Sequence, residues 1–325
     1  MSDWRLSVAA YGGPEAIARE DLGTLRPGPG EVVVRHRAIG INFIDTYHRT
    51  GLYPVPLPAG LGVEAAGIVE ALGEGVDGFS VGERVAYVTR TPGSYATART
   101  IAAAELISLP DDVDDDLAAA ALLKGLTAEA LIFRCARIEK GATALVHAAA
   151  GGVGQILVQW LHAAGVTVIA HAGSAEKAEI ARKMGADHVL HGGFNTLAED
   201  VRALTDGRGV HVSFDGVGAA SWTASLDALA RRGMMVTFGN ASGPVPPFSP
   251  LELSRRGSLF VTRPTLFDYI VTPEERQAAA DRLFAALADG TVKITIGQRF
   301  ALGDAADAHR ALEARQTTGS TLLIP

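Results

Sequence analysis

The feature that most constrains the fold is a regular alternation of short apolar segments and helix-like segments through the middle of the chain. The strand-like segments are residues 142–148, 166–170, 188–190, 210–214, 234–238 and 258–262. Helix-like segments lie between them, at 153–163, 175–184, 196–204, 221–230 and 251–255. Short strands that alternate with helices predict a parallel sheet with helices on both faces. This is the doubly wound, Rossmann-type α/β fold, which binds dinucleotides.

A glycine-rich turn follows the first of these strands. Ala149, Gly151 and Gly154 have the G-x-G-x-x-G spacing, with alanine in the first position. Such a turn fits either a dinucleotide or simple close packing of a strand and a helix. Its place between the first strand and the first helix favours the dinucleotide. Gly151 would let the backbone approach a pyrophosphate, which the helix N-terminus attracts, and Gly154 would let the helix pack closely.

The end of the second strand predicts which dinucleotide is bound. NAD-binding proteins carry an acidic residue here for the ribose hydroxyls, and that acid would repel a 2′-phosphate. The stretch VTVIAHAGSAEK (166–177) has no acid before residue 176. Ser174 and Lys177 are instead suited to a phosphate, so the sequence favours NADP(H). The alternative is that Lys177 is an ordinary solvated helix residue.

The two ends of the chain have a different character from the middle. Residues 1–123 are rich in Gly and Pro and contain short β-branched segments, which predicts a β-rich domain. After residue 267, a helix (274–288), a strand (292–300), a helix (305–315) and a closing strand (321–324) are expected to return to that domain. The expected domains are therefore 1–123 with 267–325, and 124–266.

Composition excludes several classes of function. The 325 residues carry a net charge of −7, which argues against nucleic acid and anionic membranes as partners. The single cysteine, Cys135, cannot form an internal disulfide or a cysteine-based zinc site, and we expect it to be buried. No signal peptide is evident, and the longest apolar run, 117–123, is too short to cross a bilayer. The expectation is a soluble cytoplasmic protein.

Several segments together resemble a known family. They are AIGINFIDTYHRTGLYP (38–54), GLGVEAAGIVE (60–70), LLKGLTAE (122–129), HAAAGGVG (147–154), FDGVG (214–218), FGNASGPV (238–245), VTRP (261–264) and the closing TGSTLLIP. In this order they resemble zinc-independent quinone oxidoreductases, the zeta-crystallin-like branch of the medium-chain dehydrogenase/reductase superfamily. The resemblance implies a GroES-like first domain, a Rossmann second domain and a cleft between them. It also implies a homodimer that pairs through the edge strand at 258–262.

The resemblance bears on metal binding and on the reaction. Zinc-dependent relatives have a cysteine where this chain has Asn42 and a histidine where it has Val63, so no zinc is implied. Glu64 remains, in an expected structural role. Hydride reduction of a ketone creates an alkoxide that needs a metal or proton donor. Reduction of a quinone creates a phenolate-like anion, whose conjugate acid has a pKa of about 10. The prediction is an NADPH-dependent quinone reductase.

The resemblance also assigns site residues. Tyr47 and Tyr53, with Asn42, would orient the substrate, and both tyrosines are alternatively core or rim aromatics. The residues expected to contact the cofactor are Asn42, Ile44, Asp45, Lys124, Thr127, Ala149, Gly151, Gly152, Val153, Gly154, Gly173, Ser174, Lys177, Val217, Phe238, Gly239, Asn240, Val261, Arg263 and Arg315. Asn42 is alternatively a helix cap, and the two arginines are alternatively surface charges. Gly192 stands where a family member that the chain resembles has a tyrosine near the 2′-phosphate, which weakens the expected phosphate site.

Two other functions stay open from the sequence. The first is reduction of activated C=C bonds in enals, enones or enoyl thioesters, which needs a proton donor such as Tyr53 or Tyr47. The second is an NADPH-binding protein with little turnover, as in the crystallin and RNA-binding roles of relatives. His147, just before the glycine turn, is expected to be packed rather than catalytic.

Overall fold

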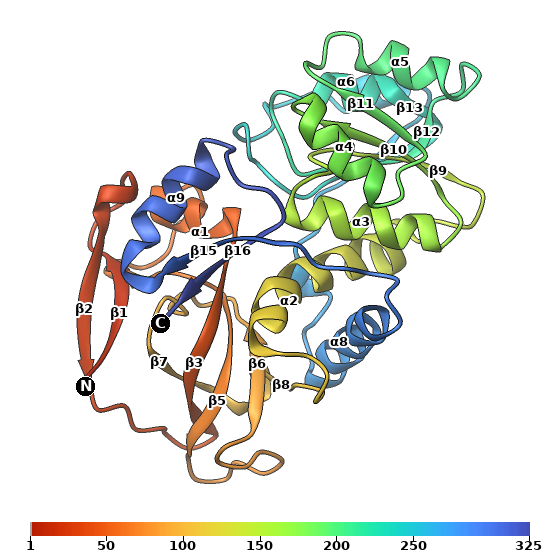
Figure 1. The fold of residues 1–325 in the computed structure, drawn as a ribbon. Coiled ribbons are helices and arrows are strands. Elements are labelled where there is room, and N and C mark those ends of the chain that lie inside the picture. Colours follow the sequence, from red (N-terminus) through yellow and green to blue (C-terminus); the bar gives the residue numbers. More distant parts are fainter. Residues whose placement is uncertain (1) are drawn as a thin grey trace. The chain divides into compact units, whose positions relative to one another are not determined.

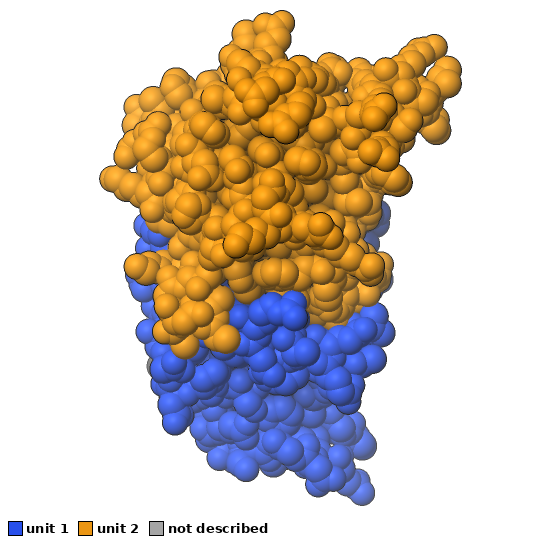
Figure 2. Space-filling model, turned by 90° about the vertical axis from the view of Figure 1, so that its right-hand side faces the viewer, with its two compact units in different colours: residues 1–124, 271–284, 294–325 blue, residues 125–270, 285–293 orange. Residues whose placement is uncertain are grey.

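The computed structural model describes residues 2–325, which form two compact units. The first contains the chain up to Lys124 with residues 271–284 and 294–325, and the second contains residues 125–270 and 285–293 (Figure 2). Lys124 was expected in the second domain but belongs to the first unit, and residues 267–270 were expected in the first domain but belong to the second unit. Residues 285–293 were likewise expected in the first domain but belong to the second unit. The Gln159 side chain explains this, because it donates to the Lys293 carbonyl (3.0 Å) and accepts from the Lys293 N–H (2.9 Å).

The first unit is built on two antiparallel-rich sheets (Figure 1). The smaller sheet has the order β2 (Ile17–Gly23), β1 (Asp3–Val8), β4 (Ala59–Gly60). The larger has the order β15 (Ile296–Ala301), β16 (Ser320–Ile324), β3 (Glu31–Ile41), β5 (Glu64–Leu72), β6 (Arg84–Val88), β8 (Leu106–Ser108), and β7 (Ala98–Ala102) also pairs with β3. Because β16 pairs with β3, the C-terminal segment completes the sheet that the N-terminal segment begins.

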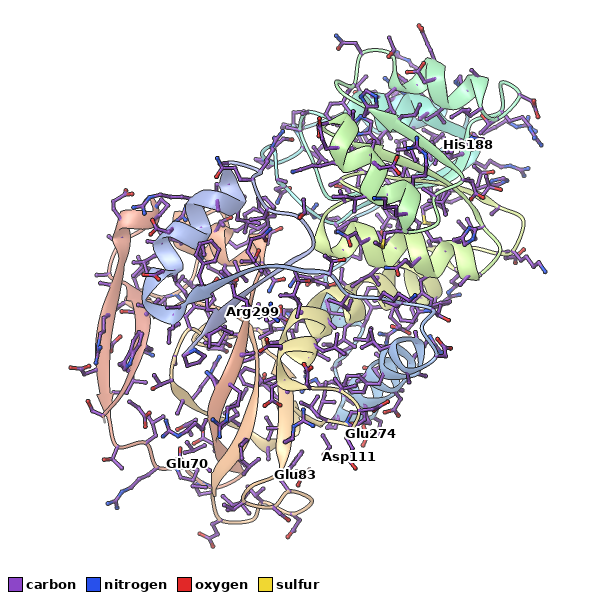
Figure 3. All side chains as sticks on the ribbon, in the orientation of Figure 1. Glu70, Glu83, Asp111, His188, Glu274 and Arg299 are labelled. Carbon is purple, nitrogen blue, oxygen red and sulfur yellow. The ribbon has the colours of Figure 1, made fainter. Side chains whose placement is uncertain are left out.

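Four α-helices carry residues of the first unit. They are α1 (Phe43–Thr50), α2 (Asp115–Glu129), α8 (Pro273–Ala288) and α9 (Ala305–Glu313), and α2 and α8 continue into the second unit. The acidic stretch before α2 caps that helix, since the Asp114 carboxylate accepts from the Leu117 N–H (2.7 Å). Figure 3 labels Arg299 on β15, which forms an ion pair with Asp116 in the first turn of α2 (2.8 Å).

The second unit confirms the predicted parallel sheet. Its six strands have the order β11 (His188–His191), β10 (Thr167–Ala172), β9 (Thr143–Val146), β12 (Val210–Asp215), β13 (Leu229–Thr237), β14 (Phe260–Thr262), and every neighbouring pair is parallel. Its helices are α3 (Gly152–Ala163), α4 (Ala175–Lys183), α5 (Leu197–Ala203), α6 (Trp222–Ala228) and α7 (Leu251–Arg255). The strand order reverses between β9 and β12, which creates the switch point where such sheets bind ligands.

Some expected elements differ in detail. The strand expected at 292–300 begins only at Ile296, because the Val292 N–H bonds to the Ala286 carbonyl at the end of α8 (2.8 Å). After α2 the chain continues as a π-helical segment, Ala130–Ala136, which contains Cys135. Cys135 is half-exposed rather than buried as expected. None of the helices in residues 2–325 has the length and apolar character needed to span a bilayer.

Candidate functional site

The glycine turn of the second unit has the geometry of an anion cradle. After β9, Ala148 adopts a left-handed conformation (φ 49°), and its carbonyl accepts from the Gly151 N–H (2.8 Å). A Cβ on Gly154 would lie 2.3 Å from the Ala148 carbonyl oxygen, so only glycine fits there. The N–H groups of Gly152, Val153 and Gly154 belong to the first turn of α3, where the helix itself offers no acceptor. Such N–H groups suit a diphosphate.

The second strand of the sheet ends in a polar corner. Ser174 is the N-cap of α4, and its hydroxyl oxygen accepts from the Lys177 N–H (3.4 Å). A hydrogen bond from the Ser174 hydroxyl holds the pKa of the Glu176 carboxyl below its usual range. Glu176 is exposed, so a carboxylate lies next to the expected phosphate site, and sequence reasoning did not weigh it. Nothing lies within 4 Å of a Cβ built on Gly173 or Gly192, so the corner is open around both glycines.

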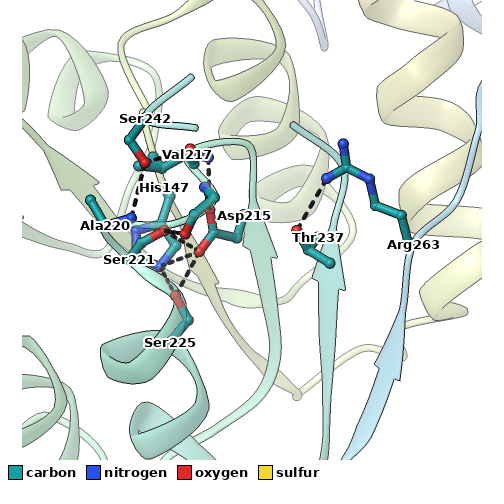
Figure 4. A network of polar contacts seen from close by, with 10 residues as sticks. His147, Asp215, Val217, Ala220, Ser221, Ser225, Thr237, Ser242 and Arg263 are labelled. Atoms are coloured by element: carbon teal, nitrogen blue, oxygen red, sulfur yellow. Dashed lines mark hydrogen bonds and ion pairs between the residues drawn. The ribbon is translucent and has the colours of Figure 1, made fainter. Parts of the chain in front are cut away.

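A buried polar network lies at the end of β12 (Figure 4). Asp215 is fully buried, and its Oδ1 accepts from the N–H groups of Val217 (2.7 Å) and Gly218 (3.1 Å). Its Oδ2 accepts from the hydroxyls of Ser221 (2.6 Å) and Ser225 (2.7 Å). The Ser225 oxygen lies 2.8 Å from His147 Nε2. Because the hydroxyl gives its one hydrogen to Asp215, Nε2 of His147 is the donor in that contact.

His147 is therefore a structural residue of the network, in line with the expectation that it is packed. It is 1% exposed, and burial lowers its pKa, so the ring is neutral at physiological pH. His171 lies beside it, with ring centroids 5.5 Å apart. Burial lowers the pKa of His171 to about 4. The ends of β9, β10 and β12 are thus joined by uncharged side chains around one buried carboxylate.

The loop after β12 is locked to the loop after β13. The Ser242 N–H donates to the Val217 carbonyl (2.8 Å), and the Phe238 N–H donates to the Asp215 carbonyl (2.8 Å). A Cβ on Gly239 would lie 2.3 Å from the Gly216 carbonyl oxygen, so the two backbones are in direct contact. Arg263, after β14, donates to the Gly239 carbonyl (2.9 Å). Val217, Phe238, Gly239 and Asn240 therefore form one surface with a fixed shape.

In the first unit, Asn42 lies between two buried carboxylates. Its Nδ2 donates to Glu64 Oε1 (2.7 Å), and its backbone N–H donates to Asp45 Oδ2 (2.8 Å). Glu64 also accepts from Lys124 Nζ (3.2 Å) and the Leu123 N–H (2.8 Å). Burial raises the pKa of Asp45 to about 7, against the opposing effect of its hydrogen bonds. Asn42 is therefore the N-cap of α1, which was the alternative interpretation of this residue. The hydrogen bond from its side chain to Glu64 also fixes its position.

The two tyrosines of the predicted acceptor site contact each other. Tyr47 on α1 and Tyr53 after it pack edge to face with centroids 5.1 Å apart, and the Tyr53 N–H donates to the Tyr47 carbonyl (3.1 Å). Tyr47 is 8% exposed and Tyr53 is half-exposed. The Tyr11 hydroxyl holds the same segment, since it donates to the Val55 carbonyl (2.7 Å) and accepts from the Val55 N–H (3.0 Å).

The comparisons identify the family. Residues 28–111 match the alcohol dehydrogenase GroES-like domain, and residues 152–285 match a family described as zinc-binding dehydrogenase. The quinone oxidoreductase of Pseudomonas aeruginosa is 51% identical over 322 residues, with 99% of each chain covered. Quinone oxidoreductase 1 of Escherichia coli is 44% identical, again with 99% of each chain covered. The chain belongs to the quinone oxidoreductase family.

Solved structures of this family agree. The E. coli quinone oxidoreductase complexed with NADPH has a TM-score of 0.96 and 44% identity, and covers 99% of this chain and 100% of that chain. The 2-haloacrylate reductase of a Burkholderia species is 42% identical, with 97% of this chain and 96% of that protein covered. The predicted family and the predicted combination of a GroES-like domain with a Rossmann sheet are therefore confirmed.

Within the quinone oxidoreductase fold, the predicted site residues fall into two groups. The Rossmann unit brings most of them to the carboxyl ends of neighbouring parallel strands: Ala149, Gly151, Gly152, Val153, Gly154, Gly173, Ser174, Lys177, Val217, Phe238, Gly239 and Asn240, with Val261 in β14 and Arg263 after it. Thr127 belongs to the same unit, on α2. The first unit holds Asn42, Ile44, Asp45, Tyr47, Tyr53 and Lys124, and Arg315 follows α9 there.

The donor set near Asn42 is poorly suited to zinc. An amide at Asn42 and a hydrocarbon at Val63 are not ligands that zinc prefers. Glu64 is already satisfied by an amide, a backbone N–H and an ammonium group. Across residues 2–325, no group of three or more His, Cys, Asp or Glu side chains is arranged to hold a metal ion.

Proposed function

We propose that this quinone oxidoreductase family member is an NADPH-dependent quinone reductase that works without a metal. The observation that carries the proposal is the environment of Glu64, where the Lys124 ammonium and the Asn42 amide converge on one carboxylate oxygen. The positive charge beside the Glu64 carboxylate is therefore the ammonium group of Lys124, which belongs to the chain itself. The names of the relatives, quinone oxidoreductases at 44% to 51% identity, support the same activity.

The residues that would hold the cofactor fit its chemistry. The first-turn N–H groups of α3 would bind the diphosphate, and Ser174 with Lys177 would bind the 2′-phosphate. The surface of Val217, Phe238, Gly239 and Asn240 would support the nicotinamide half. From the family resemblance, Asn42, Lys124 and Thr127 would also contact the cofactor. NADPH, when bound, supplies the hydride from its nicotinamide ring.

The metal-free chemistry suits a quinone. The anion left after hydride transfer resembles a phenolate, whose conjugate acid has a pKa of about 10. It needs little stabilisation and takes its proton from water. Tyr47 and Tyr53 would orient the flat acceptor by stacking or hydrogen bonding. The main contribution of the chain is to hold the reactants together and exclude competing water.

A second candidate is reduction of an activated C=C bond. The similarity to the 2-haloacrylate reductase favours it, because a haloacrylate carries such a bond. This reaction requires a proton at the α-carbon, for which Tyr53, which is half-exposed, or Tyr47 would be the donor.

An acceptor panel separates these candidates. NADPH oxidation is followed with 1,4-benzoquinone, 1,4-naphthoquinone, 2-hexenal and 2-chloroacrylate, for the wild type and Tyr53→Phe, with products identified. We expect turnover of the quinones, and only a small loss in Tyr53→Phe. Robust turnover of the alkenes alone, lost in Tyr53→Phe, would instead assign the second candidate. NADPH binding with no acceptor reduced would favour a cofactor-binding protein with little turnover.

The preference for NADPH is part of the proposal. The ratio of kcat/KM for NADPH and NADH is measured in the wild type and in Lys177→Ala. Loss of the ammonium group is expected to lower this ratio by at least about tenfold, since a charged hydrogen bond to phosphate is worth about 1.5–3 kcal/mol. An unchanged ratio would remove Lys177 from the phosphate site.

We also propose a homodimer through the edge strand β14. Phe260 on this strand is 57% exposed, and an exposed apolar edge strand favours pairing with a second copy. Light scattering is expected to give twice the chain mass of 33.8 kDa, and Phe260→Lys is expected to shift it to the monomer. A monomeric wild type would overturn this assembly.

A further inference from the structure

Four buried polar side chains form a continuous row in the first unit. They are Arg49 on α1, His309 on α9, Tyr95 after β6 and Asp45 on α1, and each is at most 1% exposed. Arg49 Nη1 lies 2.9 Å from His309 Nδ1, His309 Nε2 lies 3.0 Å from the Tyr95 hydroxyl, and that hydroxyl lies 2.9 Å from Asp45 Oδ2. The proposed reaction uses none of these contacts.

The hydrogen positions along the row follow from its first member. A guanidinium group only donates, so Nδ1 of His309 must accept. Burial, together with the charge of Arg49, lowers the pKa of His309 to about 3, so the ring is neutral and carries its one hydrogen on Nε2. That hydrogen goes to the Tyr95 oxygen, and the Tyr95 hydrogen goes to Asp45. Every donor in the row therefore points toward Asp45.

The outer end of the row is anchored. Arg49 Nη2 forms an ion pair with Glu313 at the end of α9 (2.6 Å), and its Nε donates to the Gly12 carbonyl (3.0 Å). A buried guanidinium with three separate acceptors has one available orientation. The direction of the row is thus fixed by a group that cannot rotate.

The inner end of the row is Asp45, which holds the backbone of Asn42. Asp45 Oδ2 receives the Tyr95 hydroxyl and also the backbone N–H of Asn42 (2.8 Å). The other oxygen, Oδ1, is buried and has no hydrogen-bond partner. Only the donors on Oδ2 therefore keep this carboxylate from turning. Without the Tyr95 hydroxyl, the Asn42 N–H would be the one donor left to hold the Asp45 carboxylate.

We propose that Tyr95 and His309 are positioning residues that act through Asp45 to fix Asn42 for hydride transfer. The proposal rests on the proposed role of Asn42 beside the nicotinamide ring. The charged and titratable groups around Asp45 are Glu64 on β5, Lys124 on α2, and Tyr95, His309 and Arg49 of the row itself. Neither Tyr95 nor His309 touches a reactant in this scheme.

The same unit supplies a matched control. Tyr87 is also fully buried, and its hydroxyl lies 2.8 Å from Nε2 of a buried histidine, His36. His36 Nδ1 must donate to the Ala96 carbonyl (2.7 Å), so Nε2 of this ring accepts from Tyr87. In this pair the tyrosine donates to the histidine, which is the reverse of the contact between His309 and Tyr95. The histidine in turn donates to a backbone carbonyl and not to a carboxylate. Tyr87→Phe therefore removes a buried Tyr–His bond without affecting Asp45.

The test compares Tyr95→Phe with Tyr87→Phe. Values of kcat and KM for NADPH and 1,4-benzoquinone are measured, and the folded fraction is checked by thermal melting. Tyr95→Phe is expected to lower kcat/KM roughly tenfold, while Tyr87→Phe stays within about twofold of the wild type. Equal effects of the two variants, at equal folded fractions, would overturn the proposal.

The pH profile gives a readout that a structural role alone would not move. The Tyr95 hydrogen bond lowers the pKa of Asp45, which is about 7 in the wild type. The wild-type kcat/KM is expected to rise through this region, because ionised Asp45 binds both donors more strongly. The inflection should move to higher pH in Tyr95→Phe, vanish in Asp45→Asn and stay in place in Tyr87→Phe. An inflection that is unchanged in Tyr95→Phe contradicts the proposal.

The two proposals fail in different ways. A wild type that reduces no quinone contradicts the proposed function. The affinity for NADPH then remains as the property that reports whether Asn42 is correctly positioned. In that case the Kd for NADPH, followed by nicotinamide fluorescence, is expected to rise in Tyr95→Phe and not in Tyr87→Phe. Equal affinities in the two variants would then overturn the role of the row.

Discussion

At the scale of single residues, the selectivity of the cofactor corner depends on a competition for one hydroxyl. Ser174 caps α4 with its oxygen and donates its hydrogen to Glu176. A 2′-phosphate would need the same hydrogen, and it would also be repelled by the Glu176 carboxylate. The sequence did not predict this competition for the Ser174 hydroxyl, because Glu176 lies one residue beyond the segment where an acid would hold the ribose.

Removal of that carboxylate is expected to strengthen the NADPH preference. In Glu176→Gln, the hydrogen bond from the Ser174 hydroxyl loses its charged acceptor and is weaker, and the repulsion is lost, so the ratio of kcat/KM for NADPH over NADH should rise about threefold to tenfold. Glu179→Gln on the same helix is the control, since Glu179 pairs with Arg182 instead. An effect of equal size in both variants would point to general surface charge.

At the scale of elements, the loops after β12 and β13 behave as one body anchored by Asp215. Four donors converge on this carboxylate, two from the loop backbone and two from the serines of the following segment. The motif FDGVG contained Asp215, but the sequence alone does not show that its side chain turns inward. The partner His147 is 78 residues from Ser225 along the chain.

Loss of this anchor is expected to weaken cofactor binding. Asp215→Asn replaces an anion that accepts four hydrogen bonds with a neutral amide, so the loop carrying Val217 loses its fixed shape. The Kd for NADPH should rise at least about tenfold, while the KM for the acceptor changes little. Asp227→Asn, which breaks only the partly exposed pair with Arg256, is the control. Parallel changes in both constants would show a general loss of folding.

Loss of the Tyr11 hydroxyl is expected to weaken acceptor binding, whereas loss of the Asp215 anchor is expected to weaken cofactor binding. Tyr11→Phe removes both hydrogen bonds to Val55 and frees the segment that carries Tyr53. Because Tyr11 is 40% exposed, the fold should tolerate the change. We expect the KM for the quinone to rise about threefold with little change in the Kd for NADPH. An unchanged KM would separate Tyr53 from acceptor binding.

At the scale of the whole molecule, the sequence predicts local periodicity and not the long-range polar contacts. The parallel sheet and the glycine turn follow from alternation within short windows, and both were predicted. The contact between Arg49 and His309 joins residues 260 positions apart, and although Arg49 lies in the segment 38–54, nothing in that segment indicates His309 as its partner. The exchange of hydrogen bonds between Gln159 and Lys293, which draws residues 285–293 to the second unit, joins residues 134 positions apart.

These buried contacts also determine how the whole protein responds to acid. Burial lowers the pKa of His36, His48 and His171 to about 4, and that of His309 to about 3. Folding keeps these rings neutral, whereas the unfolded chain takes up protons below a pKa of about 6.5. The stability they support is therefore complete above about pH 6.5 and is lost as the pH falls toward 4. Asp45, with its raised pKa, has the opposite sign but is a single group.

The free energy of unfolding should consequently fall steeply between pH 7 and pH 5.5. Each of these four histidines, His36, His48, His171 and His309, contributes on the order of 1 kcal/mol of destabilisation at about pH 5.5. Urea unfolding at several pH values measures the slope, which gives the number of protons taken up on unfolding. His36→Gln should reduce this number by about one, and His191→Gln, at an exposed position, is the control. A slope that is flat in the wild type would mean that the buried rings take up protons without unfolding.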